Sequence, residues 1–147
     1  MPASAGSELP PVLSVRQPWP FAIFHGGKDV ENRPRRLNYR GHLLIHSSAS
    51  ITREEAEDFR DFINAQGLRG PWCAGRNAME LPCGVILGVV DMVDCVEDSP
   101  SPWFMGKFGF VLRNPRPFAT PIAAKGQLGL WRVPGELEAA VRQAMAA

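Results

Sequence analysis

Short apolar runs, separated by glycine, proline and charged residues, recur along the chain and predict β-strands. The longest run contains Gly88, where we expect a bulge, because glycine in a strand often marks one. Two prolines at residues 113–117 instead favour an edge strand or a loop, since proline cannot donate a ladder hydrogen bond. We expect strands at residues 12–15, 39–48, 84–96, 108–112 and 128–133, and a strand or an extended turn at residues 29–33.

Three segments show helical patterns instead. Thr52, followed three residues later by Glu55, is a capping-box signature, and apolar residues then recur at helical spacing until Gly67. Residues 19–24 are almost all apolar and predict a buried helix, and residues 134–147 predict a terminal helix with one apolar side. Three helices and five or six strands, clustered late in the chain, indicate an α+β fold with a small curved sheet or barrel.

The chain contains no internal repeat and no linker between domains. A length of 147 residues suits one domain, which we place at residues 12–147, after a flexible N-terminal tail at residues 1–11. Residues 67–84 hold several glycines and prolines and predict a long loop, of the kind that is either a functional lid or disordered.

Composition narrows the functional classes. The 16 basic and 15 acidic residues give a net charge of +1, which argues against a polybasic protein whose whole surface binds nucleic acid. No apolar run approaches the roughly 20 residues of a membrane span, and the first residues lack the basic start of a signal peptide. The cysteines are odd in number and widely spaced, which suits a reduced compartment. We therefore expect a cytoplasmic protein without a membrane partner.

Charge is unevenly distributed along the chain. Residues 16–40 and 103–132 are rich in basic side chains, whereas residues 80–98 carry acids and no base. Arginine outnumbers lysine 13 to 3, and its planar guanidinium group both matches phosphate and stacks on flat rings. Two arrangements are open: the basic stretches meet and form a positive groove, or the acidic stretch pairs with them and cancels their charge.

His42 and His46 have the spacing of a metal-binding pair only if they lie on a helix. The residues between them predict a strand, in which four residues span about 13 Å. Two ligands of one zinc ion cannot be that far apart, because each nitrogen binds at about 2 Å. Gly26 and Gly27 lack the residues that complete a phosphate loop or a dinucleotide fold. We expect no metal and no cofactor.

Polar groups are most concentrated around Glu31. In an extended stretch Glu31 and Arg33 share one face, and Lys28 in the preceding turn can swing toward them. Polar groups beside apolar structure are costly unless they are paired or used. Lys28 and Glu31, or Glu31 and Arg33, therefore form either a structural ion pair or part of a functional site.

These residues belong to a signature, Gly26-x-Lys28-x-x-Glu31-x-Arg33, which resembles that of the ASCH domain, a branch of the PUA-like superfamily. Three flanking stretches also resemble this family and occur in the same order, so that the similarity covers about residues 12–133. They are Leu13-Ser14-Val15-Arg16-Gln17-Pro18-Trp19, Tyr39-Arg40-Gly41 followed by Leu43-Leu44-Ile45-His46, and Gly126-Gln127-Leu128-Gly129-Leu130-Trp131.

The resemblance implies a PUA-like β-barrel flanked by helices, with a cleft beside the signature. The family is associated with RNA and includes coactivator-linked and RNA-metabolism proteins, a ribonuclease-like member, and small amidohydrolases that remove the acetyl group from N4-acetylcytidine. In these amidohydrolases a lysine and a glutamate of the cleft act together with a threonine three residues after the lysine. Glu31 takes the place of that threonine here, which weakens the amidohydrolase interpretation.

The first functional hypothesis is a module that binds single-stranded RNA or a nucleotide in a basic cleft, with or without metal-independent cleavage of the RNA. Cleavage would use Glu31 as the base and Lys28 as the stabilising cation. Packing in the core is the alternative role for Trp19 and for Tyr39. The residues predicted to contact the ligand are Arg16, Gln17, Trp19, Asn32, Arg33, Tyr39, Arg40 and Lys125.

The second hypothesis is an amide hydrolase acting on N4-acetylcytidine or a related modified nucleoside. A lysine whose charge is suppressed by burial can act as a base or a nucleophile, so Lys28 would take that role and Glu31 would serve as the acid or as the base that activates water. The third alternative is a domain that binds a nucleotide or a peptide without any reaction.

Overall fold

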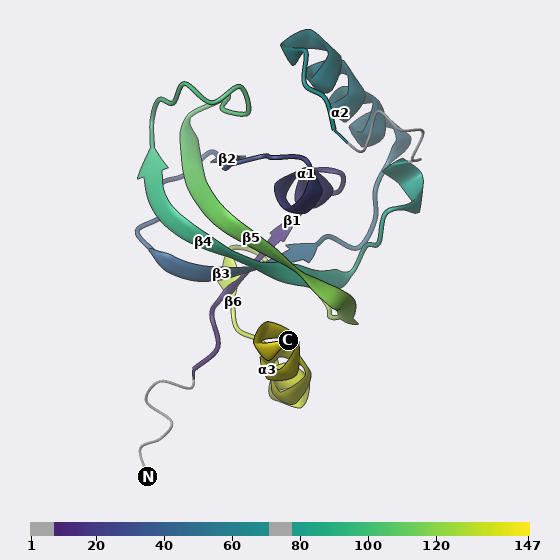
Figure 1. Ribbon diagram of the computed structural model, residues 1–147, viewed down its shortest axis with the longest axis vertical. Coiled ribbons are helices and arrows are strands. Elements are labelled where there is room, and N and C mark those ends of the chain that lie inside the picture. The colour runs from purple at the N-terminus through teal and green to yellow at the C-terminus, as the bar shows by residue number, and fades with distance from the viewer. Residues whose placement is uncertain (1–7, 71–77) are drawn as a thin grey trace.

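The computed structural model describes residues 8–70 and 78–147. Its strands are β1 (Val12–Val15), β2 (Val30–Arg33), β3 (Gly41–Ser47), β4 (Val85–Val96), β5 (Phe108–Ala123) and β6 (Leu130–Trp131). They form one sheet in the order β2-β5-β4-β3-β1-β6, in which β1 and β3 are parallel and all other neighbours are antiparallel. The sheet curls into a half-barrel (Figure 1).

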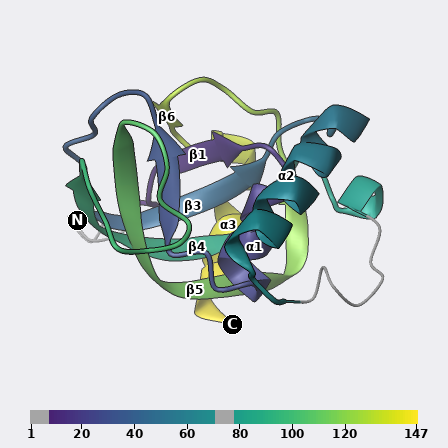
Figure 2. The ribbon, with the colours of Figure 1, turned by 90° about the horizontal axis from the view of Figure 1, so that it is seen from above.

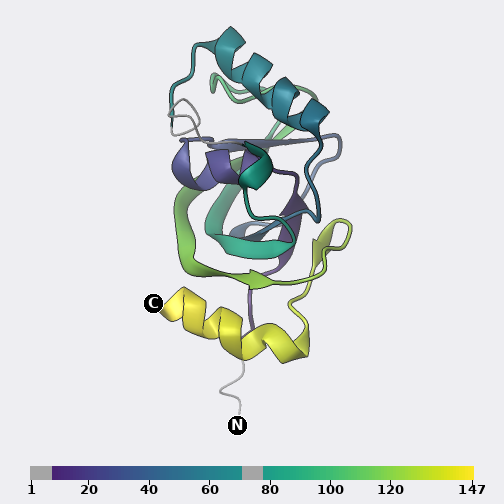
Figure 3. The ribbon, with the colours of Figure 1, turned by 90° about the vertical axis from the view of Figure 1, so that its right-hand side faces the viewer.

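Three α-helices surround this sheet: α1 (Trp19–His25), α2 (Arg53–Gln66) and α3 (Glu138–Ala146). Short 3-10 helices occupy Ala78–Glu80 and Gly135–Leu137. Figure 3 shows α1 between α2 and the hollow of the sheet, with α3 against the opposite side, and Figure 2 shows α2 crossing above α1. These elements confirm the predicted α+β fold with a small barrel-like sheet and three flanking helices.

Side-chain alternation along the strands divides the core between the two faces of the sheet. Leu13 and Val15 point to the concave face, where they pack with Ile23 of α1. Val12 points to the other face and packs in the cluster that contains Val141 of α3. Because the strand period is two residues, adjacent residues of β1 serve opposite cores. A third cluster joins α1, α2 and β2 and includes Ala22, Phe59, Ile63, Val30 and Trp103.

Helix α2 begins and ends where its sequence predicts. The Thr52 hydroxyl accepts a hydrogen bond from the Glu55 backbone N–H at 3.1 Å, and the Glu55 carboxylate accepts one from the Thr52 N–H at 2.8 Å. This reciprocal pair satisfies two backbone donors that the first turn otherwise leaves unpaired. Gly67 ends the helix with a φ of 64°, a left-handed conformation that glycine adopts without steric cost.

The longest hairpin decides between the two alternatives at residues 113–117. This segment is part of β5 and pairs with β4, whereas the described pairing with β2 on its other side ends at Val111, so the segment is an edge strand and not a loop. Register shifts accommodate the prolines, and the first shift lies between Ile86 and Gly88, directly before the glycine at which the bulge was expected. A side chain at Gly88 would place its Cβ 2.4 Å from the Arg116 carbonyl oxygen, so only glycine permits this close approach of the strands.

Two predicted segments, the N-terminal tail at residues 1–11 and the loop at residues 67–84, are only partly described by the structure. The predicted tail and the predicted lid include residues 1–7 and 71–77, which lie outside the described residues. Residues just after the first gap contact the domain: Leu9 packs near α3, and the Pro11 carbonyl accepts a hydrogen bond from the Leu44 N–H at 2.9 Å. None of the helices in the described parts of the chain has the length and apolar character to cross a membrane.

The half-barrel is left open between β2 and β1. Strand β2 pairs only with β5 in the described sheet, and residues 14–15 of β1 pair only with β3. The Arg33 side chain crosses this seam and donates a hydrogen bond from Nη2 to the Ser14 carbonyl oxygen at 2.9 Å. A guanidinium group thus takes the place of strand pairing, and the seam is the position of the candidate site.

Candidate functional site

A cleft of about 730 Å³ follows the open seam. Its walls come from four parts of the chain that are distant in sequence: the end of β1 with the start of α1, strand β2, the segment from β3 into α2, and the loop between β5 and β6. Its lining residues are Ser14, Val15, Arg16, Trp19, Glu31, Asn32, Arg33, Ser48, Ala49, Glu55, Lys125, Gly126, Gln127, Leu128 and Gly129. The structure therefore brings together Arg16, Trp19, Glu31, Asn32, Arg33 and Lys125 of the predicted set.

Glu31 and Arg33 lie side by side in the cleft, as expected for alternate residues of a strand. The Arg33 Nε atom lies 3.0 Å from Glu31 Oε2, so that it donates a charge-assisted hydrogen bond. The Glu31 side chain is only 9% exposed, whereas that of Arg33 is 27% exposed. This geometry leaves a nearly buried carboxylate in the lining of the cleft beside a partly exposed cation.

Lys28 lies behind Glu31 rather than in the cleft. Its ammonium Nζ lies 3.6 Å from Glu31 Oε1 and donates a hydrogen bond to the Val30 carbonyl oxygen. The Lys28 side chain is only 1% exposed. The Trp19 and Trp103 ring centroids lie 5.3 and 5.7 Å from Nζ, within cation–π range. Burial lowers the pKa of Lys28 below its usual value, while the Glu31 carboxylate acts in the opposite direction.

The ion pairs expected as the structural alternative at Lys28, Glu31 and Arg33 are thus both formed. Lys28 does not line the cleft, so in this conformation it acts on a ligand only through Glu31. It compensates the charge of the carboxylate and fixes its position. The sequence signature correctly brought the ammonium and the carboxylate together, but it could not indicate which of the two would face the cleft.

Trp19 belongs both to the core and to the cleft. Its ring meets Phe59 and Phe62 of α2 edge to face, with centroids 4.8 and 5.5 Å apart, and it also packs against the concave core. The same side chain lines the cleft and remains half-buried. The two roles considered for Trp19 therefore coexist: α2 holds the ring in place while part of it borders the cleft.

Arg16 and Glu55 form an ion pair in the cleft wall. The Arg16 guanidinium lies 2.7 Å from the Glu55 carboxylate, and its side chain is 64% exposed. Partial burial alone would raise the pKa of Glu55, but hydrogen bonds from Thr52 and Arg16 outweigh it and hold that pKa below its usual value. Exposed pairs of this kind contribute little to stability, so Arg16 can exchange Glu55 for another anion at low cost.

The loop between β5 and β6 supplies Lys125 and is fastened by His46. The His46 Nε2 atom lies 2.7 Å from the Ala124 carbonyl oxygen, which can only accept, so Nε2 carries the proton. His46 Nδ1 then accepts from the Ser14 hydroxyl at 2.9 Å, and the Trp131 Nε1–H donates to that hydroxyl at 3.1 Å. Burial lowers the pKa of His46, which favours this neutral form.

Ser14, Glu55 and the tip of this loop also line the cleft, although they were not among the predicted site residues. Leu128 at the tip is 98% exposed, although it is a large apolar residue. The order of the flanking stretches gave one available signal for the loop, because residues 126–131 already resembled the family pattern. Nothing in the local pattern indicated that Glu55, a helix-capping residue, would also face the cleft.

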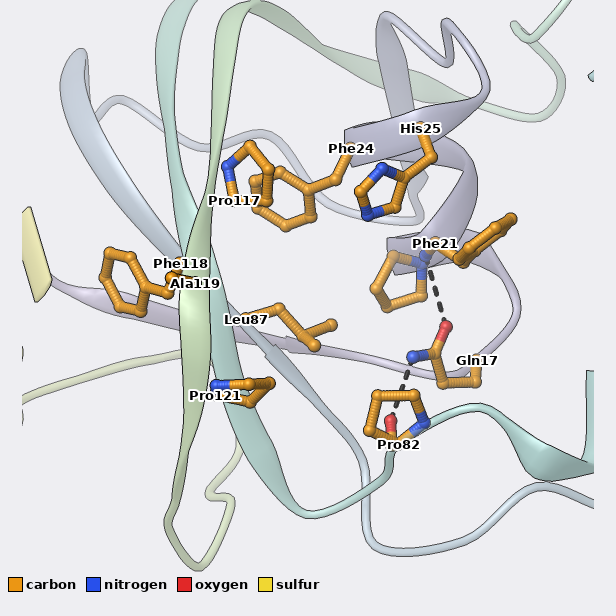
Figure 4. Close-up of a pocket in the computed structure, with 11 residues that line it drawn as sticks. Gln17, Phe21, Phe24, His25, Pro82, Leu87, Pro117, Phe118, Ala119 and Pro121 are labelled. Carbon is orange, nitrogen blue, oxygen red and sulfur yellow. Dashed lines mark hydrogen bonds between the residues drawn. The ribbon is translucent and has the colours of Figure 1, made fainter. Parts of the chain in front are cut away.

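Gln17 and Asn32 are held by hydrogen bonds to the protein. The Gln17 amide donates to the Pro82 carbonyl oxygen at 2.9 Å and accepts from the Phe21 N–H at 3.1 Å. Gln17 lines a separate hollow of about 400 Å³ on another side of α1, where phenylalanine and proline side chains predominate (Figure 4). Asn32 does line the cleft, but its amide bonds to the backbone of Trp103 and Met105.

Tyr39 and Arg40 lie away from the cleft. The Tyr39 hydroxyl donates to the His42 carbonyl oxygen at 2.6 Å, and the ring lines a hollow beside Trp131. Arg40 donates to the backbone oxygens of Leu37 and Tyr39 and pairs weakly with a carboxylate of β4. Neither residue joins the group around Glu31, and both have structural partners.

The acidic stretch neutralises part of the basic surface, as the second charge arrangement expected. Three arginines pair with it, at 2.6, 3.4 and 3.0 Å: Arg36 with Glu97, Arg40 with Asp94, and Arg116 with Asp91. Hydrogen bonding from Arg116 lowers the pKa of Asp91. The cations that line the cleft belong to a different set, Arg16, Arg33 and Lys125, so the positive character of the cleft is local and moderate.

His42 and His46 have separate partners. His42 Nδ1 lies 2.8 Å from an Asp91 carboxylate oxygen, while His46 holds the loop described above. Among the described residues, no three histidine, cysteine or acidic side chains gather as a group that could bind a metal ion.

Comparisons with known proteins agree with the signature. The sequence profile of the ASCH domain matches residues 13–107. Activating signal cointegrator 1 from Homo sapiens is 26% identical over 147 residues, and that from Mus musculus is 27% identical over 142 residues. Each alignment covers 90% of this chain but 24% of the relative, so the chain spans about a quarter of the length of these relatives. The chain belongs to the ASCH domain family.

Proposed function

We propose that the cleft binds a nucleotide segment of single-stranded RNA. The observation that carries this proposal is the convergence of Arg16, Arg33, Lys125 and the Trp19 ring on one cleft of about 730 Å³. Single strands are bound by cations that contact the phosphates and by aromatic rings that stack on the bases, each stacked base contributing about 1–3 kcal/mol. Membership in a family associated with RNA favours the same ligand.

The charges of the cleft favour a ligand that carries both an anion and hydrogen-bond donors. Its three cations face two carboxylates, Glu31 and Glu55, in the same lining. Lys125 has no ion pair within the described residues, and Arg16 can release the Glu55 carboxylate, so these two cations are the proposed phosphate contacts. Glu31 would instead face donor groups of a base. A nucleotide offers both kinds of group.

Binding of a labelled single-stranded RNA octamer, followed by fluorescence anisotropy at increasing salt, tests the proposal. We expect Lys125→Ala and Arg16→Ala each to weaken binding and to reduce the slope of log affinity against log salt by about 0.7, the value for one lost phosphate contact on a single strand. Arg36→Ala is the matched control, since it also removes an arginine but one that pairs with Glu97 outside the cleft lining. Absent or salt-insensitive binding, or equal loss in the control, contradicts the proposal.

The contact between Glu31 and Lys28 favours hydrolysis as a second candidate function. In RNA cleavage Glu31 would take the 2′-hydroxyl proton, and Arg33, which is more exposed than Lys28, would stabilise the charged phosphorane. In deacetylation of N4-acetylcytidine Glu31 would activate water, and the buried Lys28 would hold that carboxylate in place.

Two product assays separate these reactions from binding. N4-acetylcytidine incubated with the protein should yield cytidine if the chain is an amidohydrolase, and labelled RNA should yield shorter fragments if it is a ribonuclease. Glu31→Gln should abolish either product, because the amide is not a base. If the wild-type protein forms no product but still binds RNA, the chain is a binding module.

We also propose a reduced, cytoplasmic location, which the free thiols of Cys83 and Cys95 fit.

A further inference from the structure

We propose that Glu31 and Arg33 recognise the Watson–Crick edge of guanine, so that the cleft prefers RNA segments containing this base. The inference rests on the proposed RNA-binding function and names the base that the site selects. It follows from the acceptors of Glu31 and the free donor of Arg33 in the lining of the cleft.

The Glu31 side chain lines the cleft and carries two acceptor oxygens. Its Oε2 accepts from Arg33 Nε at 3.0 Å, and its Oε1 faces Lys28 Nζ at 3.6 Å. A carboxylate oxygen has two acceptor positions, so each oxygen can receive one further donor. The side chain is 9% exposed, which leaves water little access to these positions, and a buried acceptor gains most from a donor that a ligand supplies.

The Arg33 guanidinium adds a donor next to these acceptors. It is fixed at two points, Nε to Glu31 and Nη2 to the Ser14 carbonyl oxygen at 2.9 Å. No contact within the described residues uses its third nitrogen, Nη1, and the side chain is 27% exposed. The cleft wall therefore carries two carboxylate acceptors and one free guanidinium donor on neighbouring residues of β2.

Guanine carries a complementary set of groups, two donors and one acceptor, on its Watson–Crick edge. Its N2 amino group and N1–H are adjacent donors that match the two carboxylate oxygens, and its O6 acceptor matches the guanidinium. Adenine and cytosine each place a ring-nitrogen acceptor beside their amino group, and uracil flanks its single N–H with two carbonyl oxygens. In all three a lone pair would face a carboxylate oxygen without a proton between them, which is unfavourable.

An aromatic ring lies beside this edge-reading pair. The Glu31 carboxylate and the Trp19 ring share Lys28 as a neighbour, because Lys28 Nζ lies 3.6 Å from Glu31 Oε1 and 5.3 Å from the Trp19 ring centroid. Both line the cleft. A base held by its edge at Glu31 is therefore within reach of ring contact with Trp19, which combines stacking with edge recognition as is usual for single-stranded RNA.

Fluorescence anisotropy with five oligouridine heptamers tests the inference. The heptamers differ only in the central nucleoside, which is guanosine, inosine, adenosine, cytidine or uridine. We expect the guanine oligomer to bind between about fivefold and a hundredfold more tightly than the all-uridine one, the range for one bidentate base contact. Inosine keeps N1–H and O6 but lacks the N2 amino group, so its affinity should be intermediate.

Two variants with the same change of charge identify the residue responsible. Glu31→Gln presents one acceptor and one donor in place of two acceptors, so the ratio of guanine to uracil affinity should fall to about one. Glu55→Gln removes the other carboxylate of the cleft and should leave that ratio unchanged, although the affinity for every oligomer can rise as Arg16 is released. Circular dichroism establishes that each variant is folded.

The outcomes separate this inference from the function on which it rests. Equal, salt-dependent binding of all five wild-type complexes overturns guanine selection but leaves RNA binding in place. A guanine preference that survives in folded Glu31→Gln likewise overturns the assignment to Glu31. Binding of none of the oligomers contradicts the proposed function itself, and the inference fails with it. If Glu31→Gln does not fold, the affinities of the wild-type protein for the guanosine and inosine oligomers decide. Weaker binding of the inosine oligomer supports recognition of the N2 amino group, and equal binding contradicts it.

Discussion

Replacing Glu31 by alanine should leave the Lys28 ammonium buried without its carboxylate partner. The Lys28 side chain is 1% exposed and would retain the Val30 carbonyl oxygen, two indole rings and the electrostatic influence of Asp29, but no ion-pair partner within the described residues. Removing one member of a buried ion pair generally costs about 3–5 kcal/mol. Arg33 also loses its partner, but its greater exposure lets water replace the carboxylate. We therefore expect Glu31→Ala to lower the free energy of unfolding by about 3–5 kcal/mol.

Lys28→Met should cost less, about 1–2 kcal/mol, chiefly the hydrogen bond to Val30. The carboxylate keeps Arg33 at 3.0 Å in that variant, and an apolar side chain suits the site between two tryptophans. In the double variant no unpaired buried charge remains. The two substitutions should consequently be non-additive, with a coupling energy of about 2 kcal/mol, inside the range measured for contacting residues.

Urea unfolding of the wild-type protein and the three variants at pH 7, with linear extrapolation to water, measures this coupling. A coupling energy under about 0.5 kcal/mol, the limit for independent sites, would refute the argument that Glu31 compensates a buried ammonium. The pH dependence gives a second check. Burial lowers the pKa of Lys28 from 10.5, and loss of Glu31 removes an interaction that raises it.

The sign of the pH effect follows from proton binding. Between the folded pKa of Lys28 and its unfolded value, the unfolded chain binds more protons, so the free energy of unfolding rises with pH. This window is wider in Glu31→Ala than in the wild-type protein. The stability deficit of the variant should accordingly shrink between pH 7 and pH 10, and a constant deficit would contradict a charged Lys28 as its cause.

Three further predictions concern the stability of the strands and helices around the cleft. His46 is buried with a lowered pKa, so the free energy of unfolding of the wild-type protein should fall as the pH drops below about 6.5, where the unfolded histidine takes up a proton. The decrease should be at most about 1.4 kcal/mol per pH unit, and urea unfolding of His46→Gln should show a flatter pH profile in this range. Gly88→Ala should lower the free energy of unfolding by about 1–3 kcal/mol, because its Cβ would lie 2.4 Å from the Arg116 carbonyl oxygen. Gly135→Ala, whose Cβ would have no atom within 4 Å, should lower it clearly less. Equal effects of the two substitutions in thermal or urea unfolding would contradict the argument from close approach. Thr52→Ala should destabilise the protein by about 1 kcal/mol through loss of the α2 cap, and an unchanged urea midpoint would show that the cap is dispensable.

Local sequence rules predicted much of the architecture. The Thr52–Glu55 capping box, the end of α2 at Gly67 and the register shift beside Gly88 depend on residues close in sequence or on backbone conformations that few residues adopt. At residues 113–117 the prolines left an edge strand and a loop as alternatives. Long-range pairing with β4 decides for the edge strand, because register shifts in the ladder accommodate residues that cannot donate.

The candidate site was only partly predictable. Alternation along a strand correctly placed Glu31 and Arg33 together, and the family signature added Lys28. Which of these groups faces the cleft depends on how α1, α2 and β2 pack, since the aromatic rings of that cluster enclose the lysine and leave the carboxylate at the surface of the cleft. Gln17 differs from its neighbour Arg16 for the same reason: the turn into α1 directs one side chain inward and leaves the other exposed.

The amino-acid sequence alone determined the class of fold, the family, and a short segment rich in charged groups, because these depend on periodicity, capping and spacing within a few residues. Only the tertiary structure decided that the half-barrel stays open between β1 and β2, and that residues as distant as Arg16, Arg33 and Lys125 line that opening while Tyr39 and Arg40 do not. The physical reason is that strand order and side-chain burial are set by the packing of the whole chain, which no local pattern encodes.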